Sequence, residues 1–245
     1  MKNPKVRQIV LPLITAMISC GVMLSIGINL QQYGMRETSA GKGGFITALY
    51  IVLVPVFGLL IGKKPSKCVW LFVALAVAGL YFLCFTGGEA LSFAGGDFYT
   101  FLCAIAFTIH IMLVDHFGSR VDSIELSCIQ FVTVGVISGI CALLFGEQTT
   151  AEEIRICLPY ILYAGILTGG VGYTCQVVAQ KDGDPTVISL LLSLESFFAV
   201  VSGAIFLHER MSVREYFGCA LMLTAAVLSR LPEKSGKAVE SAKEA

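Results

Sequence analysis

The sequence predicts an all-α membrane protein, a polytopic bundle of about eight transmembrane helices. Of its 245 residues, 56% are hydrophobic and only 14% are charged, and the mean hydropathy is +0.81. A soluble domain is nearer about 45–50% apolar and about 25% charged. The apolar residues form runs of roughly 20, the helical length that spans a hydrocarbon core of ~30 Å.

Eight such runs can be drawn, separated by turns rich in Gly, Pro and charged residues. Their approximate bounds are 9–33, 43–62, 68–87, 97–115, 124–145, 156–179, 185–207 and 213–230. The turns before the second to the eighth helix are, in order, Thr38–Gly44, Lys63–Pro65, Gly95–Asp97, Gly118–Arg120, Gly146-Glu147, Asp182–Pro185 and His208–Arg210.

The two ends of the chain need separate interpretation. The first run follows Lys2, Lys5 and Arg7, as in a signal peptide, but it extends to about Leu30 without an A-x-A cleavage site. It is therefore predicted to be a membrane helix. The polar tail, residues 233–245, is predicted to be disordered.

The distribution of basic residues predicts the orientation. Placing the N-terminus inside leaves most of the 17 Lys and Arg residues in cytoplasmic segments, as the positive-inside rule requires. We therefore expect a multi-pass protein of the cell membrane with both termini in the cytoplasm. The net charge of zero gives no support for nucleic-acid binding.

An internal repeat is predicted by a shift of about 145 residues, which places helices one to three on helices six to eight. Gly27 then meets Gly172 and Gln31 meets Gln176, although the matching helix lengths carry more weight than these sparse identities. Because helices one and six are an odd number apart, the copies have opposite orientations, as in inverted-repeat transporters. Residues 1–90 would form an incomplete first repeat of three helices, and residues 91–232 a second repeat of five. The symmetry predicts two more helices before residue 1.

Two groups of motifs resemble the EamA family of the drug/metabolite transporter superfamily. The second-repeat group comprises Asp184–Ser196 (DPTVISLLLSLES), Gly203, His208-Glu209 and Gly218; the first-repeat group comprises Leu30–Gly34, Thr38–Gly41 and Val54–Val56. Ser196 replaces the common Pro and His208 the common Gly. The resemblance covers roughly residues 9–230. It implies a ten-helix transporter of which this sequence begins at the third helix.

Glu195 is the first candidate for a substrate-binding residue. It lies about ten residues past Pro185, or roughly 15 Å along a helix, near the middle of the membrane. A carboxylate at that depth costs on the order of 2.5–3.5 kcal/mol by insertion scales, so it must be paired or face a water-filled cavity. It could bind a cationic or hydrogen-bonding substrate or carry a proton. The alternative is a structural carboxylate bonded to a neighbouring helix.

A second set of candidates lies on one face of the sixth helix. Tyr173, Gln176 and Gln180 recur at helical spacing with Gly169, and Gln31 occupies the related place in the first helix. Amides are costly against lipid, so this face is predicted to look inward and line a substrate cavity. Interhelical hydrogen bonding is the alternative.

Other polar residues are predicted to be structural. His110, Asp115 and His116 lack a third ligand at a recognisable spacing, so they are interpreted as interfacial, and no metal, cofactor or catalytic residue is expected. Lys42 could attract anionic solutes, but snorkelling to the interface is favoured. The nine cysteines contain no CxxC pair and are interpreted as reduced.

The favoured function is a secondary transporter of small organic solutes (metabolites, amino acids or drugs) that works by alternating access. No Walker-type phosphate loop is present, and an intramembrane enzyme lacks a partner set for Glu195 or His110, so no enzyme activity is expected. The alternative is a truncated, non-transporting fragment or an accessory membrane subunit. The expected partners are the lipid bilayer and a small-molecule substrate, and a homodimer could complete the bundle.

Overall fold

The computed structural model describes residues 4–63, 65–85, 95–146, 149–181, 183–206, 208 and 211–230, with backbone alone at 4–13, 40 and 230. The predicted disordered tail, residues 233–245, lies outside the described residues. Every described element is helical, which confirms the predicted all-α membrane bundle.

Each of the eight predicted runs contains helix. The elements are α1 Pro4–Gly34, α2 Ala40–Ala48, α3 Tyr50–Leu60, α4 Lys67–Cys84, α5 Gly95–Gly118, α6 Ser123–Leu144, α7 Ala151–Tyr163, the π-helix η1 Ala164–Tyr173, α8 Thr174–Lys181, α9 Pro185–Leu192, α10 Leu194–Phe206 and α11 Val213–Arg230. In the described part of the chain, seven spans are long and apolar enough to cross a membrane. The eighth predicted run, α11, has 18 residues and carries Arg214, Glu215 and Arg230.

Side-chain caps fix where several helices begin. Asp122 accepts hydrogen bonds from the backbone of Ile124 and Glu125 at the start of α6. Asp184 caps α9 in the same way, with Pro185 in the first turn, where its missing N–H costs no hydrogen bond. Thr150 and Glu153 form a capping box at α7. The turn chemistry in the sequence therefore determines these boundaries.

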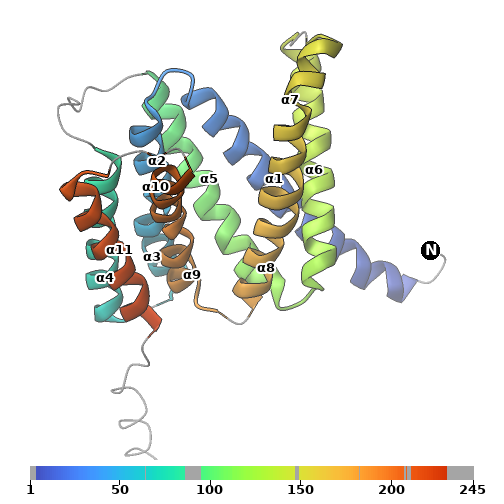
Figure 1. Ribbon diagram of the computed structural model, residues 1–245. Coiled ribbons are helices and arrows are strands. Elements are labelled where there is room, and N and C mark those ends of the chain that lie inside the picture. Colours follow the sequence, from blue (N-terminus) through green and yellow to red (C-terminus); the bar gives the residue numbers. More distant parts are fainter. Residues whose placement is uncertain are drawn as a thin grey trace, which may run out of the picture.

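Three groups of helices make up the bundle (Figure 1). The α4–α11 pair lies on one side, the α2–α3 and α9–α10 segments occupy the middle, and α1 and α5 pass beside them towards α6 and α7. The main hydrophobic core joins the first two groups, because Ile51 of α3, Leu80 of α4, Leu190 of α9 and Met222 of α11 are all at most 1% exposed and belong to one cluster.

Close approach at glycines binds α1 to α5 and α6. A Cβ on Gly27 would lie 2.6 Å from the Phe107 ring of α5, and one on Gly21 would lie 2.6 Å from Thr133 Cβ of α6. The Asn29 amide also donates to Ser138 Oγ of α6 at 3.2 Å. Small residues at such crossings let membrane helices pack closely.

Two of the predicted helices are broken near their middle. The predicted helix 43–62 is divided into α2 and α3 at Leu49, and the predicted helix 185–207 is divided into α9 and α10 at Ser193. Both residues stay near the α region but with small ψ angles, −12° at Leu49 and −17° at Ser193. Three residues after each break the backbone N–H bonds back to the break residue, at 2.9 Å from Val52 and 3.2 Å from Ser196. This tighter 3₁₀-type bonding shifts the helix locally.

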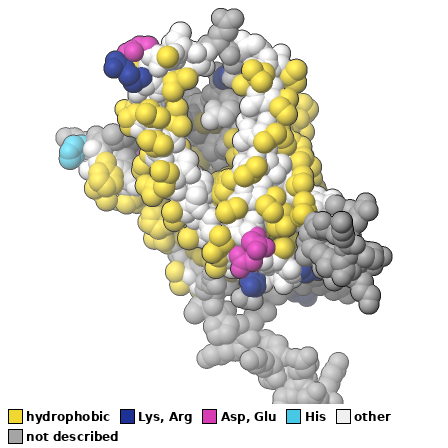
Figure 2. Space-filling view, turned by 90° about the vertical axis from the view of Figure 1, so that its right-hand side faces the viewer, with side chains coloured by type: hydrophobic (Ala, Val, Ile, Leu, Met, Phe, Trp, Pro, Cys, Tyr) yellow, Lys and Arg dark blue, Asp and Glu magenta, His cyan; other side chains and the backbone are white. Residues whose placement is uncertain are grey.

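The predicted helix 156–179 is also irregular, because ten of its residues form η1. This segment contains Gly165, Gly169, Gly170 and Gly172. Glycine weakens the preference for the α-helix, and π-turns often mark functional positions in helices. Among the described residues, neither α7 nor η1 has a buried residue. Figure 2 views the molecule from the right-hand side of Figure 1, the side on which α6 and α7 lie, and this face is covered mainly by apolar side chains.

Candidate functional site

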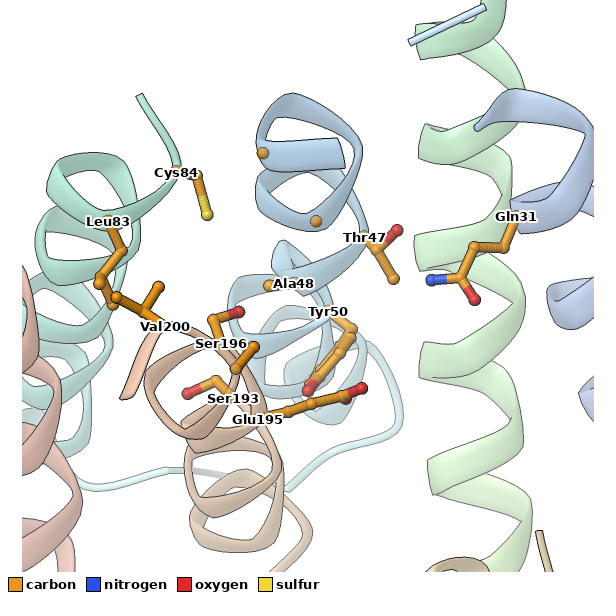
Figure 3. Close-up of a pocket in the computed structure, with 13 residues that line it drawn as sticks. Gln31, Thr47, Ala48, Tyr50, Leu83, Cys84, Ser193, Glu195, Ser196 and Val200 are labelled. Atoms are coloured by element: carbon orange, nitrogen blue, oxygen red, sulfur yellow. The ribbon is translucent and has the colours of Figure 1, made fainter. Parts of the chain in front are cut away.

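A cavity of about 510 Å³ opens beside the two helix breaks. Residues at or beside each break line it: Thr47 and Ala48 of α2, Tyr50 of α3, the break residue Ser193 and Glu195 of α10. In Figure 3 the Tyr50 and Glu195 side chains lie together, and the Gln31 amide points towards them from α1. The cavity is thus enclosed by elements from both ends of the chain.

The break at Ser193 precedes Glu195 by two residues. Because α10 begins at Leu194, Glu195 lies in the first turn of α10, where the helix is locally irregular. Glu195 is exposed, and its exposed surface borders the cavity. The structure therefore places this carboxylate where a solute can reach it.

The hydroxyl-bearing residues Tyr50 and Ser193 line the cavity together with Glu195, with different roles. The Tyr50 side chain lies beside that of Glu195 in Figure 3, and Tyr50 is 8% exposed. By contrast, Ser193 Oγ donates to the Leu190 carbonyl at 2.7 Å, so this hydroxyl is used by its own helix. Tyr50 is the better candidate for donating a hydrogen bond within the cavity.

The predicted site residues are only partly brought together. Glu195 and Gln31 line the cavity, whereas Tyr173, Gln176 and Gln180 do not. The Tyr173 ring instead makes an edge contact with the Phe131 ring of α6, at 6.0 Å between centroids. The Gln180 amide donates to the Ile111 carbonyl of α5 at 3.1 Å, and Gln176 donates to Gln180 Oε1 at 3.3 Å. Gln180 thus makes the interhelical hydrogen bond that the sequence offered as the alternative, while Gln176 bonds within its own helix, α8.

Tyr50 and Thr47 are cavity residues that the sequence reasoning missed. The signal was present for Tyr50, because the repeat shift of 145 residues relates it to Glu195. Leu49 and Ser193, where the helices break, are separated in the sequence by nearly the same number of residues as Tyr50 and Glu195. Thr47 has no comparable signal in the sequence.

His110 is buried rather than interfacial, which corrects the prediction. It is 1% exposed in α5, and its Nε2 lies 3.2 Å from Gln130 Oε1 of α6. The His110 ring also makes an edge contact with Tyr173, at 6.5 Å between centroids. A polar side chain inside the bundle must find a partner, and Gln130 supplies one.

The prediction that Lys42 snorkels to the interface is wrong. Its ammonium lies 2.5 Å from Asp97 Oδ2, while Thr38 Oγ1 donates to Asp97 Oδ1 at 3.0 Å. The Asp97 side chain is 2% exposed and that of Lys42 is 14% exposed. This buried ion pair joins α2 to the start of α5, close to the cavity wall that Gly41 and Gly44 form.

The fold defines a class, the multi-pass helical membrane proteins, and in this chain a cavity lies beside two broken helices. A family model described as "EamA-like transporter family" matches residues 2–85 and 94–231. The chain belongs to this family.

Similar proteins agree with this assignment. An "Uncharacterized transporter" of Archaeoglobus fulgidus is 29% identical over 216 residues, 86% of this chain and 67% of that protein. The "Uncharacterized transporter YvbV" of Bacillus subtilis is 25% identical over 234 residues, 91% of this chain and 73% of its own length. A solved structure, "Crystal structure of protein", has a TM-score of 0.68 at 16% identity and covers 90% of this chain and 87% of its own; this match supports the fold alone. The chain is a multi-pass membrane transporter.

The buried ion pair gives the first prediction. Asp97→Asn should lower the melting temperature in detergent, because breaking a buried pair costs about 3–5 kcal/mol by leaving one charge unpaired. Replacing both partners, with Lys42→Met and Asp97→Leu, should recover most of the loss.

Glu152→Gln is the matched control. It breaks the ion pair between Glu152 and Arg155, whose side chains are 63% and 77% exposed, respectively. Such exposed ion pairs contribute little to stability. Equal melting temperatures for Asp97→Asn and Glu152→Gln would contradict the structural role of Asp97.

Proposed function

We propose that this chain moves small organic solutes, such as metabolites, amino acids or drugs, across the membrane by alternating access. The observation that carries the proposal is that Glu195 borders a cavity built from two discontinuous helices. Secondary transporters with inverted repeats hold their substrates near the midplane, at helices broken in this way. The cavity volume of about 510 Å³ also lies within the usual range for small-molecule sites.

The lining favours a solute with a cationic or hydrogen-bond-donating group and a modest apolar body. Glu195 supplies an anionic acceptor, while the Gln31 amide on the other side can both donate and accept. Leu83, Ala199 and Val200 supply apolar surface. Few fixed polar groups within a mainly apolar lining are typical of sites that orient a small ligand.

A second cavity supports alternating access. It has a volume of about 530 Å³ and is lined by the other part of α3 and the start of α9, including Val54, Gly58 and Pro185. The residues of α3 and α9 between the two cavities are packed, with Ile51 at 0% and Ile188 at 3% exposure. Movement of α3 against α9 would close one cavity while extending the other, without a channel open at both ends.

The second candidate function is that of an accessory membrane subunit or a fragment that does not transport by itself. The observation that favours it is the absence of buried residues among the described residues of α7 and η1. In a complete bundle we would expect each membrane helix to pack on its neighbours. Solute binding can be tested independently of transport, which separates the two candidates.

Glu195→Gln is the test of the solute site. It keeps the size of the side chain and removes the negative charge. We expect a solute found by thermal-shift screening of amino acids and organic cations to bind at least tenfold more weakly, with an unchanged folded yield. Glu125→Gln, an exposed carboxylate at the start of α6, is the matched control and should bind as the wild type does.

The opposite pattern would overturn the assignment of Glu195. A reduced folded yield with normal binding per folded molecule would identify a structural carboxylate. Uptake into proteoliposomes then separates transport from binding. Binding that depends on Glu195 without uptake would favour the accessory-subunit candidate.

We also infer that the protein lies in the cell membrane with both termini in the cytoplasm, on the basis of the distribution of Lys and Arg. In a background without reactive native cysteines, Glu152→Cys at the start of α7 should react with an impermeant thiol reagent added to intact cells. Ser66→Cys, before α4, should react only after the cells are opened. Reaction of Ser66→Cys alone in intact cells would reverse the orientation.

A further inference from the structure

An apolar groove runs along α4, which lies with α11 at the edge of the bundle opposite α6 and α7 (Figure 1). The groove has a volume of about 550 Å³ and shares no lining residue with either cavity described above. Phe45 of α2 and Val52 of α3 form one wall, and α4 forms the rest. It is therefore a separate feature of the outer surface of the bundle.

The dimensions of the groove suit a lipid chain. Trp70, Ala74, Ala78 and Tyr81 lie on one face of α4, and the two small alanines hollow this face between the two large rings. From Trp70 to Tyr81 the helix rises roughly 17 Å, at about 1.5 Å per residue. This is slightly more than half of a hydrocarbon core of ~30 Å, so it matches the depth of one leaflet and is too short to seat a whole transmembrane helix.

A cation lies at one end of the groove. The guanidinium carbon of Arg214, the second residue of α11, is 5.2 Å from the centre of the Tyr81 ring and 5.4 Å from that of the Phe82 ring. Both rings line the groove. Stacking on aromatic faces holds a guanidinium in place and leaves its charge intact. Arg214 therefore marks the end of the groove at which α4 ends and α11 begins.

This cation has no anionic partner within the part of the chain that the structure describes. Arg214 makes no hydrogen bond or ion pair there, and its Nε is buried without a hydrogen-bond partner. The adjacent Glu215 is used by its own helix, because its carboxylate accepts hydrogen bonds from the backbone N–H and the hydroxyl of Ser212, at 2.6 and 2.7 Å. Successive residues of a helix also do not face each other. A phosphate is the anion that a guanidinium binds best, through paired N–H donors.

We propose that the α4 groove binds an anionic phospholipid, with one acyl chain along the face from Trp70 to Tyr81 and the phosphate on the guanidinium of Arg214. The apolar groove and the unpaired cation at its end match the two parts of such a lipid. A headgroup without an ammonium of its own, as in phosphatidylglycerol, leaves the phosphate free to pair with Arg214. This inference concerns lipid and does not depend on solute binding by Glu195.

Trp70 provides a direct test, because it is the single tryptophan of the chain and it lines the groove. The full chain is placed in phosphatidylcholine vesicles that contain a small fraction of phosphatidylglycerol or phosphatidylcholine with brominated acyl chains, which quench tryptophan fluorescence on contact. From this quenching we expect the wild type to bind the brominated phosphatidylglycerol about fivefold more tightly than the brominated phosphatidylcholine. Arg214→Gln should bind the two lipids equally, and Arg214→Lys, which keeps the charge, should retain part of the preference.

Two further variants separate the groove from the general effect of charge. Arg155→Gln removes the same charge from an exposed side chain at the start of α7, at the same end of the bundle (Figure 1), and should keep the full preference. Ala74→Phe, at an exposed position of α4, fills the groove and should lose the preference although Arg214 is intact. Folded yield and melting temperature in detergent are measured for every variant. If Arg214→Gln does not fold, Arg214→Lys and Ala74→Phe carry the test.

Three results would overturn the proposal. Equal quenching of the wild type by the two brominated lipids would show that the groove does not select a headgroup. An undiminished preference in Arg214→Gln or in Ala74→Phe would show that the lipid binds elsewhere and that Arg214 is only stacked on its rings. A loss in Arg155→Gln as large as that in Arg214→Gln would show that net charge alone attracts the lipid.

Discussion

The structure depends on the requirement that backbone hydrogen bonds be satisfied inside a membrane. Lipid offers no partners for a free N–H or carbonyl group, so a helix can be interrupted at depth only where protein or a water-filled cavity surrounds the interruption. The chain interrupts two helices, at Leu49 and Ser193, and the same cavity lies beside both. The break at Ser193 places Glu195 in the first turn of α10. The candidate site thus lies where the backbone is irregular, and lipid tolerates such irregularity only beside protein or a cavity.

The same constraint applies to several other polar groups of the bundle. Asp97 is satisfied by Lys42 and Thr38, His110 by Gln130, and Gln180 by the Ile111 carbonyl. Each of these pairs joins two different helices, so the polar groups determine which helices are neighbours while the apolar core supplies most of the contact area. Glu195 differs from them because its exposed surface faces a cavity. That difference, and not its position in the sequence alone, makes it the favoured solute-binding group.

The sequence predicted the fold class and the eight helical runs because hydropathy is a collective property of about 20 residues and tolerates local irregularity. It also named Glu195 and Gln31 as candidates, and both line the cavity. The breaks were missed because neither Leu49 nor Ser193 is a Gly or Pro, and a change of ψ by some tens of degrees leaves the apolar pattern intact. The Lys42–Asp97 pair was missed because the two residues lie in different helices, and one sequence gives no measure of such distances. The repeat shift would have identified Tyr50 if it had been applied to Glu195.

The central claim is that solute binds between the two helix breaks. The most direct measurement is an experimental structure of the protein with a bound solute from the binding screen. The account predicts solute density between Leu49 and Ser193, with a cationic or donor group within hydrogen-bond distance of the Glu195 carboxylate. Density confined to the second cavity near Lys63 and Asp115, or at the lipid-facing surface, with the first cavity empty, would contradict it.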